Sequence, residues 1–121
     1  IHQTGDAKFK DYERITNLRD TLSSHFKIRY AVEKFIDPSL VGSILKNCDL
    51  VICRAGMNTV TELIYFGKPG LLIPLPFSQG NEQLKNARFL KSLKLGKVLL
   101  QNKIDSENLN PKSLFLDFGI T

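Results

Sequence analysis

Residues 50–69 of the chain, LVICRAGMNTVTELIYFGKP, decide its fold. They open with an apolar run, 50–53, which is typical of a strand covered on both faces of a sheet. After a glycine turn, apolar residues recur at helical spacing on one stripe, namely Val60, Leu63 and Ile64. Gly67 and Pro69 are suited to end this helix. The stretch therefore predicts a strand, a turn and a helix, in that order.

The residues after this unit repeat the same pattern. Apolar residues 70–73 predict a second buried strand, and a loop rich in proline follows it. Asn81 is suited to cap a long helix that Gly96 ends, and residues 98–100 predict a last short strand. Two weaker helix starts lie in the tail, at Asp105 and at Asn110-Pro111.

The residues before the unit predict two more helices and another strand. Asp6 is expected to cap an amphipathic helix that runs to about Ser24, and residues 28–32 alternate like a strand. Asp37, followed by a proline, is expected to cap a helix to about Asn47. Strands that alternate with helices predict an α/β fold: a Rossmann-like parallel sheet with helices on both faces and right-handed crossovers.

Length and composition favour one domain over residues 1–121, since 121 residues with 42% hydrophobic content bury one core. The net charge of +5 is compatible with an anionic partner. The basic residues are scattered, however, and no DNA- or RNA-binding signature accompanies them, so we expect no nucleic acid partner.

The cysteines and the hydropathy indicate a reduced, cytosolic compartment. Cys48 and Cys53 lack the spacing of a zinc or redox motif and are expected to be buried thiols. No apolar run approaches the roughly 18 residues of a membrane span, and the first residues do not resemble a signal peptide. The opening residues 1–5, IHQTG, read as the end of a strand and its turn, which suggests a fragment.

A ligand site is expected in the loops that leave the strands, because ligands of open parallel sheets bind outside the carboxyl ends of the strands. Four loops qualify and could line one cleft: 3–5, 35–36, 54–59 and 74–83.

The segment RAGMNTVTE, residues 54–62, is the strongest candidate within those loops. Gly56 permits a tight turn and a close approach of the backbone, and free amides at a helix start suit a diphosphate. Arg54 adds a positive charge beside them. The alternative is that Thr59 to Glu62 is only a capping box, with Glu62 turned back onto its own helix.

A second polar cluster lies in the loop 74–83 and comprises Ser78, Gln79, Asn81, Glu82 and Gln83. Its amides and carboxylate are able to bind the hydroxyls of a sugar. The alternative is a solvated helix start with Asn81 as its cap. His2 and His25 are isolated, no metal site and no base–nucleophile set emerges, and the absence of GxGxxG argues against an NAD or FAD cofactor.

These motifs, in this order, resemble the glycosyltransferases of the MurG type, in glycosyltransferase family 28. Those enzymes transfer N-acetylglucosamine from UDP-N-acetylglucosamine to undecaprenyl-linked muramoyl-pentapeptide. The resemblance covers about residues 1–101. It rests on HQTG at 2–5, FI at 35–36, CRAG at 53–56, TVTEL at 59–63, GKP at 67–69, IPLP at 73–76, Gln83 and NA at 86–87.

The resemblance implies that the chain is the carboxyl-terminal, donor-binding half of a two-domain GT-B enzyme. The missing half would bind the lipid-linked acceptor and supply the general base, so the chain alone would be inactive. The reaction would invert the sugar without a metal or other cofactor. The enzyme would be cytoplasmic and peripheral on the inner face of the cell membrane, with possible contact to anionic lipid.

The resemblance also implies roles for single residues. The backbone at Ile36 would contact uracil, and Glu62 would bind the ribose hydroxyls. Met57, Asn58 and Thr59 would line the diphosphate. Glu82 and Gln83 would reach the N-acetylglucosamine.

Two residues depart from the family pattern and keep other functions open. Glu82 stands where His or Gln is usual, and Gly80 stands where an acidic residue is common, so sugar selectivity is less secure than nucleotide binding. One alternative is a separate donor-binding subunit of a two-chain glycosyltransferase. Another is a non-catalytic nucleotide-binding scaffold. Residues 113–121 give no match to the family, and the role of residues 102–121 stays open.

Overall fold

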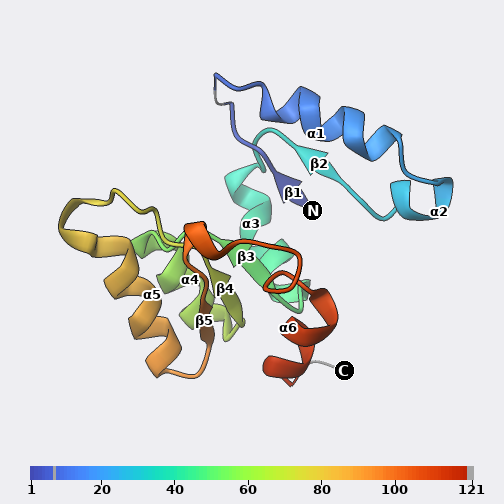
Figure 1. Ribbon diagram of the computed structural model, residues 1–121. Coiled ribbons are helices and arrows are strands. Elements are labelled where there is room, and N and C mark those ends of the chain that lie inside the picture. Colours follow the sequence, from blue (N-terminus) through green and yellow to red (C-terminus); the bar gives the residue numbers. More distant parts are fainter. Residues whose placement is uncertain (7, 120–121) are drawn as a thin grey trace. The chain divides into compact units, whose positions relative to one another are not determined.

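The computed structural model describes residues 1–6 and 8–119 and divides the chain into two compact units, Ile1–Gly42 and Ser43–Thr121 (Figure 1). Each unit contains its own parallel sheet. The predicted α/β fold, with parallel strands and covering helices, is confirmed, although the strands form two sheets where one was expected. Within the described residues, no helix is long and apolar enough to cross a bilayer.

The first unit is built on a two-stranded parallel sheet in which His2 is paired with Val32. Its elements in chain order are β1 (His2–Gln3), α1 (Asp11–Asp20), α2 (Ser24–Lys27) and β2 (Val32–Glu33). The next helix, α3 (Pro38–Asn47), starts in this unit. Its predicted cap is confirmed, because the Asp37 carboxylate accepts hydrogen bonds from the backbone N–H of Ser39 at 2.9 Å and from its hydroxyl at 2.8 Å. These two bonds, the backbone one first, lower the pKa of Asp37.

Two predictions for the first unit are wrong. The helix expected to start after Asp6 begins at Asp11, because Lys10 before it has the left-handed φ of 53°, and it ends at Asp20 rather than Ser24. The strand expected at residues 28–32 is mostly a turn, in which the N–H groups of residues 28–30 bond to carbonyls just upstream. Those amides are therefore not available to a sheet.

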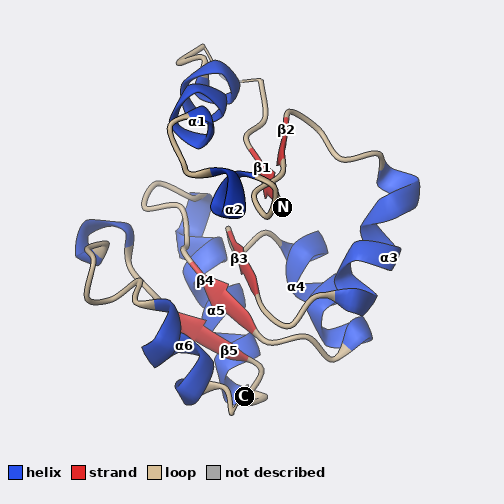
Figure 2. Cartoon of the chain, turned by 90° about the vertical axis from the view of Figure 1, so that its right-hand side faces the viewer, coloured by secondary structure: helices blue, strands red, loops and turns tan. Residues whose placement is uncertain are grey.

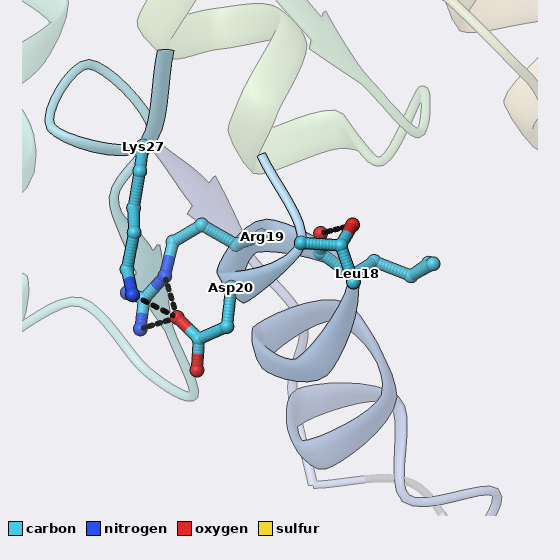
Figure 3. Close-up of polar contacts among 5 residues, drawn as sticks. Leu18, Arg19, Asp20 and Lys27 are labelled. Atoms are coloured by element: carbon cyan, nitrogen blue, oxygen red, sulfur yellow. Dashed lines mark hydrogen bonds and ion pairs between the residues drawn. The ribbon is translucent and has the colours of Figure 1, made fainter. Parts of the chain in front are cut away.

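The carboxylate of Asp20 links the end of α1 to α2 (Figure 3). Its Oδ1 lies 3.1 Å from Nζ of Lys27 and 3.2 Å from Nη2 of Arg19. The hydrogen bond from Lys27, with a smaller contribution from Arg19, lowers the pKa of Asp20. Since Asp20 and Lys27 are exposed and Arg19 is partly exposed, this contact is sensitive to salt.

The second unit is a three-stranded parallel sheet in the order β3-β4-β5. Its strands are β3 (Val51–Cys53), β4 (Gly70–Leu72) and β5 (Gly96–Val98), and its helices are α4 (Met57–Phe66), α5 (Glu82–Ser92) and α6 (Pro111–Asp117). Two short 3-10 helices, Gln79–Asn81 and Gln101–Lys103, follow β4 and β5.

Helices cover both faces of this sheet, because successive residues of β4 point to opposite sides. Gly70 faces α4 and α5, where an added Cβ would meet Leu63 at 2.8 Å and Leu90 at 3.6 Å. Leu71 packs on the other side with Leu114 of α6. The helix α6 accordingly lies on the opposite side of the sheet from α5 (Figure 2). The core of the unit therefore has two layers, one on each face of β4.

Most element predictions for the second unit are confirmed, and the exceptions have local causes. β3 is not covered on both faces, since Ile52 is 55% exposed. α5 ends at Ser92, and the residue with a left-handed φ after it is Lys94 rather than Gly96. Gly96 instead starts β5, which ends at Val98 and not at residue 100.

In the tail, Asn110 caps α6 as predicted, because its Oδ1 accepts from the N–H groups of Lys112 and Ser113 at 3.0 and 3.4 Å. The helix start expected at Asp105 is wrong. The carboxylate of Asp105 accepts from the backbone N–H of Asn108 at 2.8 Å and closes an isolated turn.

Candidate functional site

The loop that leaves β3 ends in a helix start with free backbone donors. Gly56 is the N-cap of α4, and its carbonyl accepts the first helical hydrogen bond, from Val60 N–H at 3.0 Å. Before that bond come the N–H groups of Met57, Asn58 and Thr59. Among the described residues, these three groups have no hydrogen-bond acceptor, and no side chain caps the helix. Three free donors at the positive end of a helix dipole form a binding position for an anion.

The conformation of Gly56 differs from the expected tight turn. Its φ of −64° and ψ of 151° are open to any residue, and an added Cβ would meet nothing within 4 Å. The backbone alone does not explain a glycine here. Two physical reasons remain: glycine is among the residues favoured at an N-cap, and the missing Cβ would let a ligand approach the backbone closely.

The capping-box alternative for Thr59 to Glu62 is wrong. Thr59 lies inside α4 rather than at its N-cap, so its hydroxyl is not placed to cap the helix. The hydroxyl of Thr61 donates to the carbonyl of Met57 at 2.8 Å. Glu62 is exposed, and within the described residues its carboxylate makes no hydrogen bond or ion pair. Asn58 and Glu62 are four residues apart, so they share one face of α4.

The start of α5 meets this loop through the side chain of Gln83. Its Oε1 accepts from the backbone N–H of Ala55 at 3.3 Å and from that of Leu75 at 2.9 Å. Because both partners are donors, they fix the orientation of the amide and leave its Nε2 as a donor. The hydroxyl of Ser78 accepts from the backbone N–H of Gln83 at 3.2 Å. Gln83 thus joins the loops that leave β3 and β4.

Ser78 is half-buried, and the other residues of the polar cluster around Gln83 are exposed. Glu82 is exposed at the first position of α5. Asn81 occupies the N-cap position with a left-handed φ of 55°, but its side chain makes no capping hydrogen bond, so the expected cap is wrong. Gly80, just before it, also has a positive φ of 59°.

Two further contacts hold the loop after β3. The Arg54 guanidinium donates to the carbonyl of Ile73 at 3.2 Å, and its other N–H groups stay exposed. Nδ2 of Asn86, which is 8% exposed, donates to the carbonyl of Ala55 at 3.1 Å. Sequence reasoning did not assign a role to Asn86, although a polar residue between apolar core positions of a helix was a usable signal.

A largely apolar hollow of about 500 Å³ lies beside this cluster, where the chain leaves β4 and β5. Its lining residues are Pro74, Leu75, Pro76, Phe77, Asn81, Leu84, Leu100, Gln101 and Asn102. Phe77 is 97% exposed. The hollow therefore adds an apolar surface next to the polar residues of the site.

Ile36 is the one predicted site residue in the first unit. Its backbone N–H already donates to Oε1 of Gln3 at 2.8 Å. A nucleobase in contact with this backbone would therefore have the carbonyl oxygen of Ile36 as its hydrogen-bond partner, because the N–H is already bonded. The role of Ile36 stays a prediction.

The cysteines and acidic groups of the described residues do not form a reactive or metal-binding cluster. No three His, Cys, Asp or Glu side chains in residues 1–6 and 8–119 are grouped to hold a metal ion. Cys53, at the end of β3, is a free thiol, and burial raises its pKa to about 11. It is therefore protonated at neutral pH and a poor nucleophile.

A parallel sheet layered by helices, with free helix amides at its carboxyl edge, gives the second unit a Rossmann-like α/β fold. A comparison with known protein families identifies the family to which the chain belongs. The glycosyltransferase family 28 C-terminal domain matches residues 1–116, and the chain belongs to this family.

Curated proteins with similar sequences are longer than this chain. A UDP-N-acetylglucosamine--N-acetylmuramyl-(pentapeptide) pyrophosphoryl-undecaprenol N-acetylglucosamine transferase of Rickettsia bellii is 38% identical over 93% of this chain and 30% of its own length. Proteins of the same name from Rickettsia canadensis and Prochlorococcus marinus are 42% and 33% identical, over 96% and 86% of this chain. The chain thus spans about 30% of the length of these relatives.

A solved structure supports the fold. The glycotransferase of kitacinnamycin aligns with a TM-score of 0.63 over 94% of this chain and 32% of its own, at 16% sequence identity.

Proposed function

We propose that this chain binds UDP-N-acetylglucosamine as the donor-binding part of an N-acetylglucosaminyltransferase of peptidoglycan synthesis. The acceptor would be the lipid-linked muramoyl-pentapeptide named in its relatives. The observation that carries the proposal is helix α4, whose first turn has three free amides and whose second turn carries the exposed carboxylate of Glu62, in a chain of this family.

The diphosphate would bind at the amides of Met57, Asn58 and Thr59, with Arg54 nearby. Gly56 would let the phosphates approach the backbone without meeting a Cβ. As the bond between sugar and phosphate breaks, negative charge grows on the UDP leaving group. Helix amides and the helix dipole stabilise that charge without a metal, and they do so most strongly in the transition state.

The remaining groups would select the nucleoside and the sugar. The Glu62 carboxylate is able to accept from both vicinal hydroxyls of a ribose. The Ile36 carbonyl would meet uracil. Gln83 has donors left only at Nε2, so it would donate to a hydroxyl or acetamido oxygen of the sugar, and Glu82 would accept from a sugar hydroxyl.

Groups outside this chain would complete the reaction. The general base and the binding surface for the lipid-linked acceptor would lie in the other part of the protein. Because that acceptor is membrane-bound, the enzyme would work at the cytoplasmic face of the membrane, where its basic residues would favour anionic lipid.

Calorimetric titration with UDP-N-acetylglucosamine, UDP-glucose and UDP tests this proposal. We expect the acetylated sugar nucleotide to bind most tightly. Glu62→Gln should raise its Kd roughly tenfold to a hundredfold, because hydrogen bonds to a charged group contribute about 1.5–3 kcal/mol. Glu107→Gln, at another exposed carboxylate, is the control and should bind like the wild type.

Two results would count against the proposal. If no uridine nucleotide binds, the chain is not a donor site by itself. If UDP binds but the sugar makes no difference, a nucleotide-binding scaffold explains the chain better, and the departures at Gly80 and Glu82 would account for the loss.

A further inference from the structure

The excess of positive charge in this protein lies in α5 and the residues that follow it. Residues 83–104 contain six basic residues and no acidic one, so this stretch has a formal charge of +6, whereas the whole chain has +5. The rest of the chain therefore sums to −1. The six basic residues are all exposed, namely Lys85, Arg88, Lys91, Lys94, Lys97 and Lys103. Basic residues that look scattered over the sequence thus dominate one segment of the structure.

The helix gathers part of this charge on one surface, which we call the α5 outer face. Its residues are spaced three or four apart and are exposed, namely Lys85, Arg88, Phe89 and Ser92. They lie opposite the buried stripe of the same helix, and α5 forms one flank of the second unit (Figure 1). Within the residues that the structure describes, neither Lys85 nor Arg88 forms an ion pair. Both charges are therefore available to an anionic partner.

An aromatic ring stands among these charges. Phe89 is 56% exposed, and Leu93, one turn further along, is 44% exposed. Basic groups combined with an exposed ring or aliphatic side chain are typical of surfaces that lie on a bilayer, because the charges attract anionic headgroups while the apolar group enters the acyl boundary. A face that only kept the helix solvated would not need an exposed phenylalanine.

We propose that the α5 outer face is a contact surface for an anionic phospholipid bilayer, with Lys85 and Arg88 against the headgroups and Phe89 as the apolar anchor. The surface itself rests on charge and exposure alone. The choice of a bilayer over another polyanion rests also on the proposed function, in which the acceptor is lipid-linked.

The position of α5 gives this contact a consequence for the donor site. The helix starts at Glu82, next to Gln83, whose side chain joins the loops that leave β3 and β4. Eleven residues of helix span about 16 Å. A bilayer along α5 would therefore run beside the donor site, where a membrane-bound acceptor has to arrive.

Sedimentation of the chain with vesicles at physiological salt tests the electrostatic part. We expect binding to vesicles of phosphatidylcholine with phosphatidylglycerol and none to phosphatidylcholine alone. Lys85→Gln with Arg88→Gln should lower the affinity for the anionic vesicles roughly tenfold to thirtyfold, since each basic residue at such a surface contributes about fivefold.

The matched control removes the same charge elsewhere. Lys46 in α3 and Lys112 in α6 are exposed, and α6 lies on the opposite side of the sheet from α5 (Figure 2). Lys46→Gln with Lys112→Gln should stay within about threefold of wild type, because charges far from the contact are screened. Equal losses in the two double variants would overturn the proposal, and so would failure of the wild type to bind anionic vesicles.

A fluorescent probe tests the apolar anchor. The chain has no tryptophan, so Phe89→Trp introduces a single indole on the α5 outer face. Phe115→Trp does the same on α6, where the phenylalanine is 39% exposed. Anionic vesicles should shift the emission of Phe89→Trp to the blue and leave that of Phe115→Trp unchanged. An unshifted emission in Phe89→Trp would overturn the anchor.

Two further results separate the bilayer from other partners and from the proposed function. A short RNA that binds the chain more tightly than the vesicles do, with the same loss in the α5 double variant, would assign the face to nucleic acid and overturn the proposal. If vesicles bind as expected while no uridine nucleotide does, the proposed function fails and the membrane contact stands.

Discussion

Two glycines of the second unit have opposite reasons for lacking a side chain. At Gly70 a Cβ would lie 2.8 Å from Cδ1 of Leu63, so Gly70→Ala should destabilise the chain by about 1–3 kcal/mol through overpacking. At Gly56 the space is open and φ is −64°, so Gly56→Ala should change stability by less than about 1 kcal/mol. Its effect should be a loss of affinity for UDP-N-acetylglucosamine.

Urea unfolding and calorimetry of the two variants check this pair. The expected pattern is a lowered midpoint only for Gly70→Ala and a raised Kd for Gly56→Ala at unchanged stability. Normal binding by Gly56→Ala would mean that the ligand does not approach this backbone, and the diphosphate position at α4 would be wrong.

The limit of sequence reasoning at the residue scale is visible at Gln83 and Asn86. Gln83 could be singled out as a polar residue at a helix start, but its two acceptor contacts join residues that are 28 and 8 positions away. Asn86 offered only its polarity within an apolar stripe. Such contacts depend on how α5 packs against the loop, and no local pattern encodes that.

At the scale of elements, two asparagines before helices differ in what they stabilise. The side chain of Asn110 accepts from the N–H groups of Lys112 and Ser113, whereas that of Asn81 makes no capping bond. Asn110→Ala should therefore cost about 1 kcal/mol of stability. Asn81→Gly should be close to neutral, since its φ of 55° suits glycine. If urea unfolding showed the same decrease in the free energy of unfolding for Asn110→Ala and Asn81→Gly, this assignment of the caps would be wrong.

The link between α1 and α2 through Asp20 should depend on pH. Its pKa is lowered from 3.8 in the folded chain, so the unfolded chain binds the proton first as pH falls. The stabilisation is therefore fully present above about pH 5 and is lost as pH falls through the folded-state pKa. The difference in thermal midpoint between wild type and Asp20→Asn should be constant above about pH 5 and should shrink as pH falls below that value, with Asp49→Asn as an exposed control. A difference that did not shrink would show that the carboxylate charge is not responsible.

Elements were predictable where burial and spacing agree. The run 70–72 is buried along its whole length, and the stripe of Val60 and Leu63 faces the core, so both the strand and the helix were found. The alternation at residues 28–32 is misleading because Ile28 is 83% exposed and buries no face. Apolar and polar residues do alternate at 28–32, but the apolar side chain of Ile28 is not buried, so the alternation does not mark a strand.

At the scale of the whole molecule, the α/β class and the family followed from the order of the motifs, while the arrangement into two sheets did not. Strand pairing is a long-range property, and the apolar runs do not state which strands are neighbours. The prediction of one domain over residues 1–121 is likewise a statement about association of the units, and it stays a prediction.

The chain spans about 30% of the length of its relatives, which leads to a prediction about catalysis. Under the proposed function, donor binding would need the α4 amides and Glu62, which this chain contains, whereas transfer would also need a held acceptor and a base. We expect the chain to bind UDP-N-acetylglucosamine but to transfer no labelled N-acetylglucosamine to a lipid-linked acceptor. Orienting two reactants supplies about 7–11 kcal/mol of a barrier, so its absence should abolish detectable turnover rather than halve it. Measured transfer at the rate of a full-length relative would show that these residues hold both substrates, and the separation of donor and acceptor sites would be wrong.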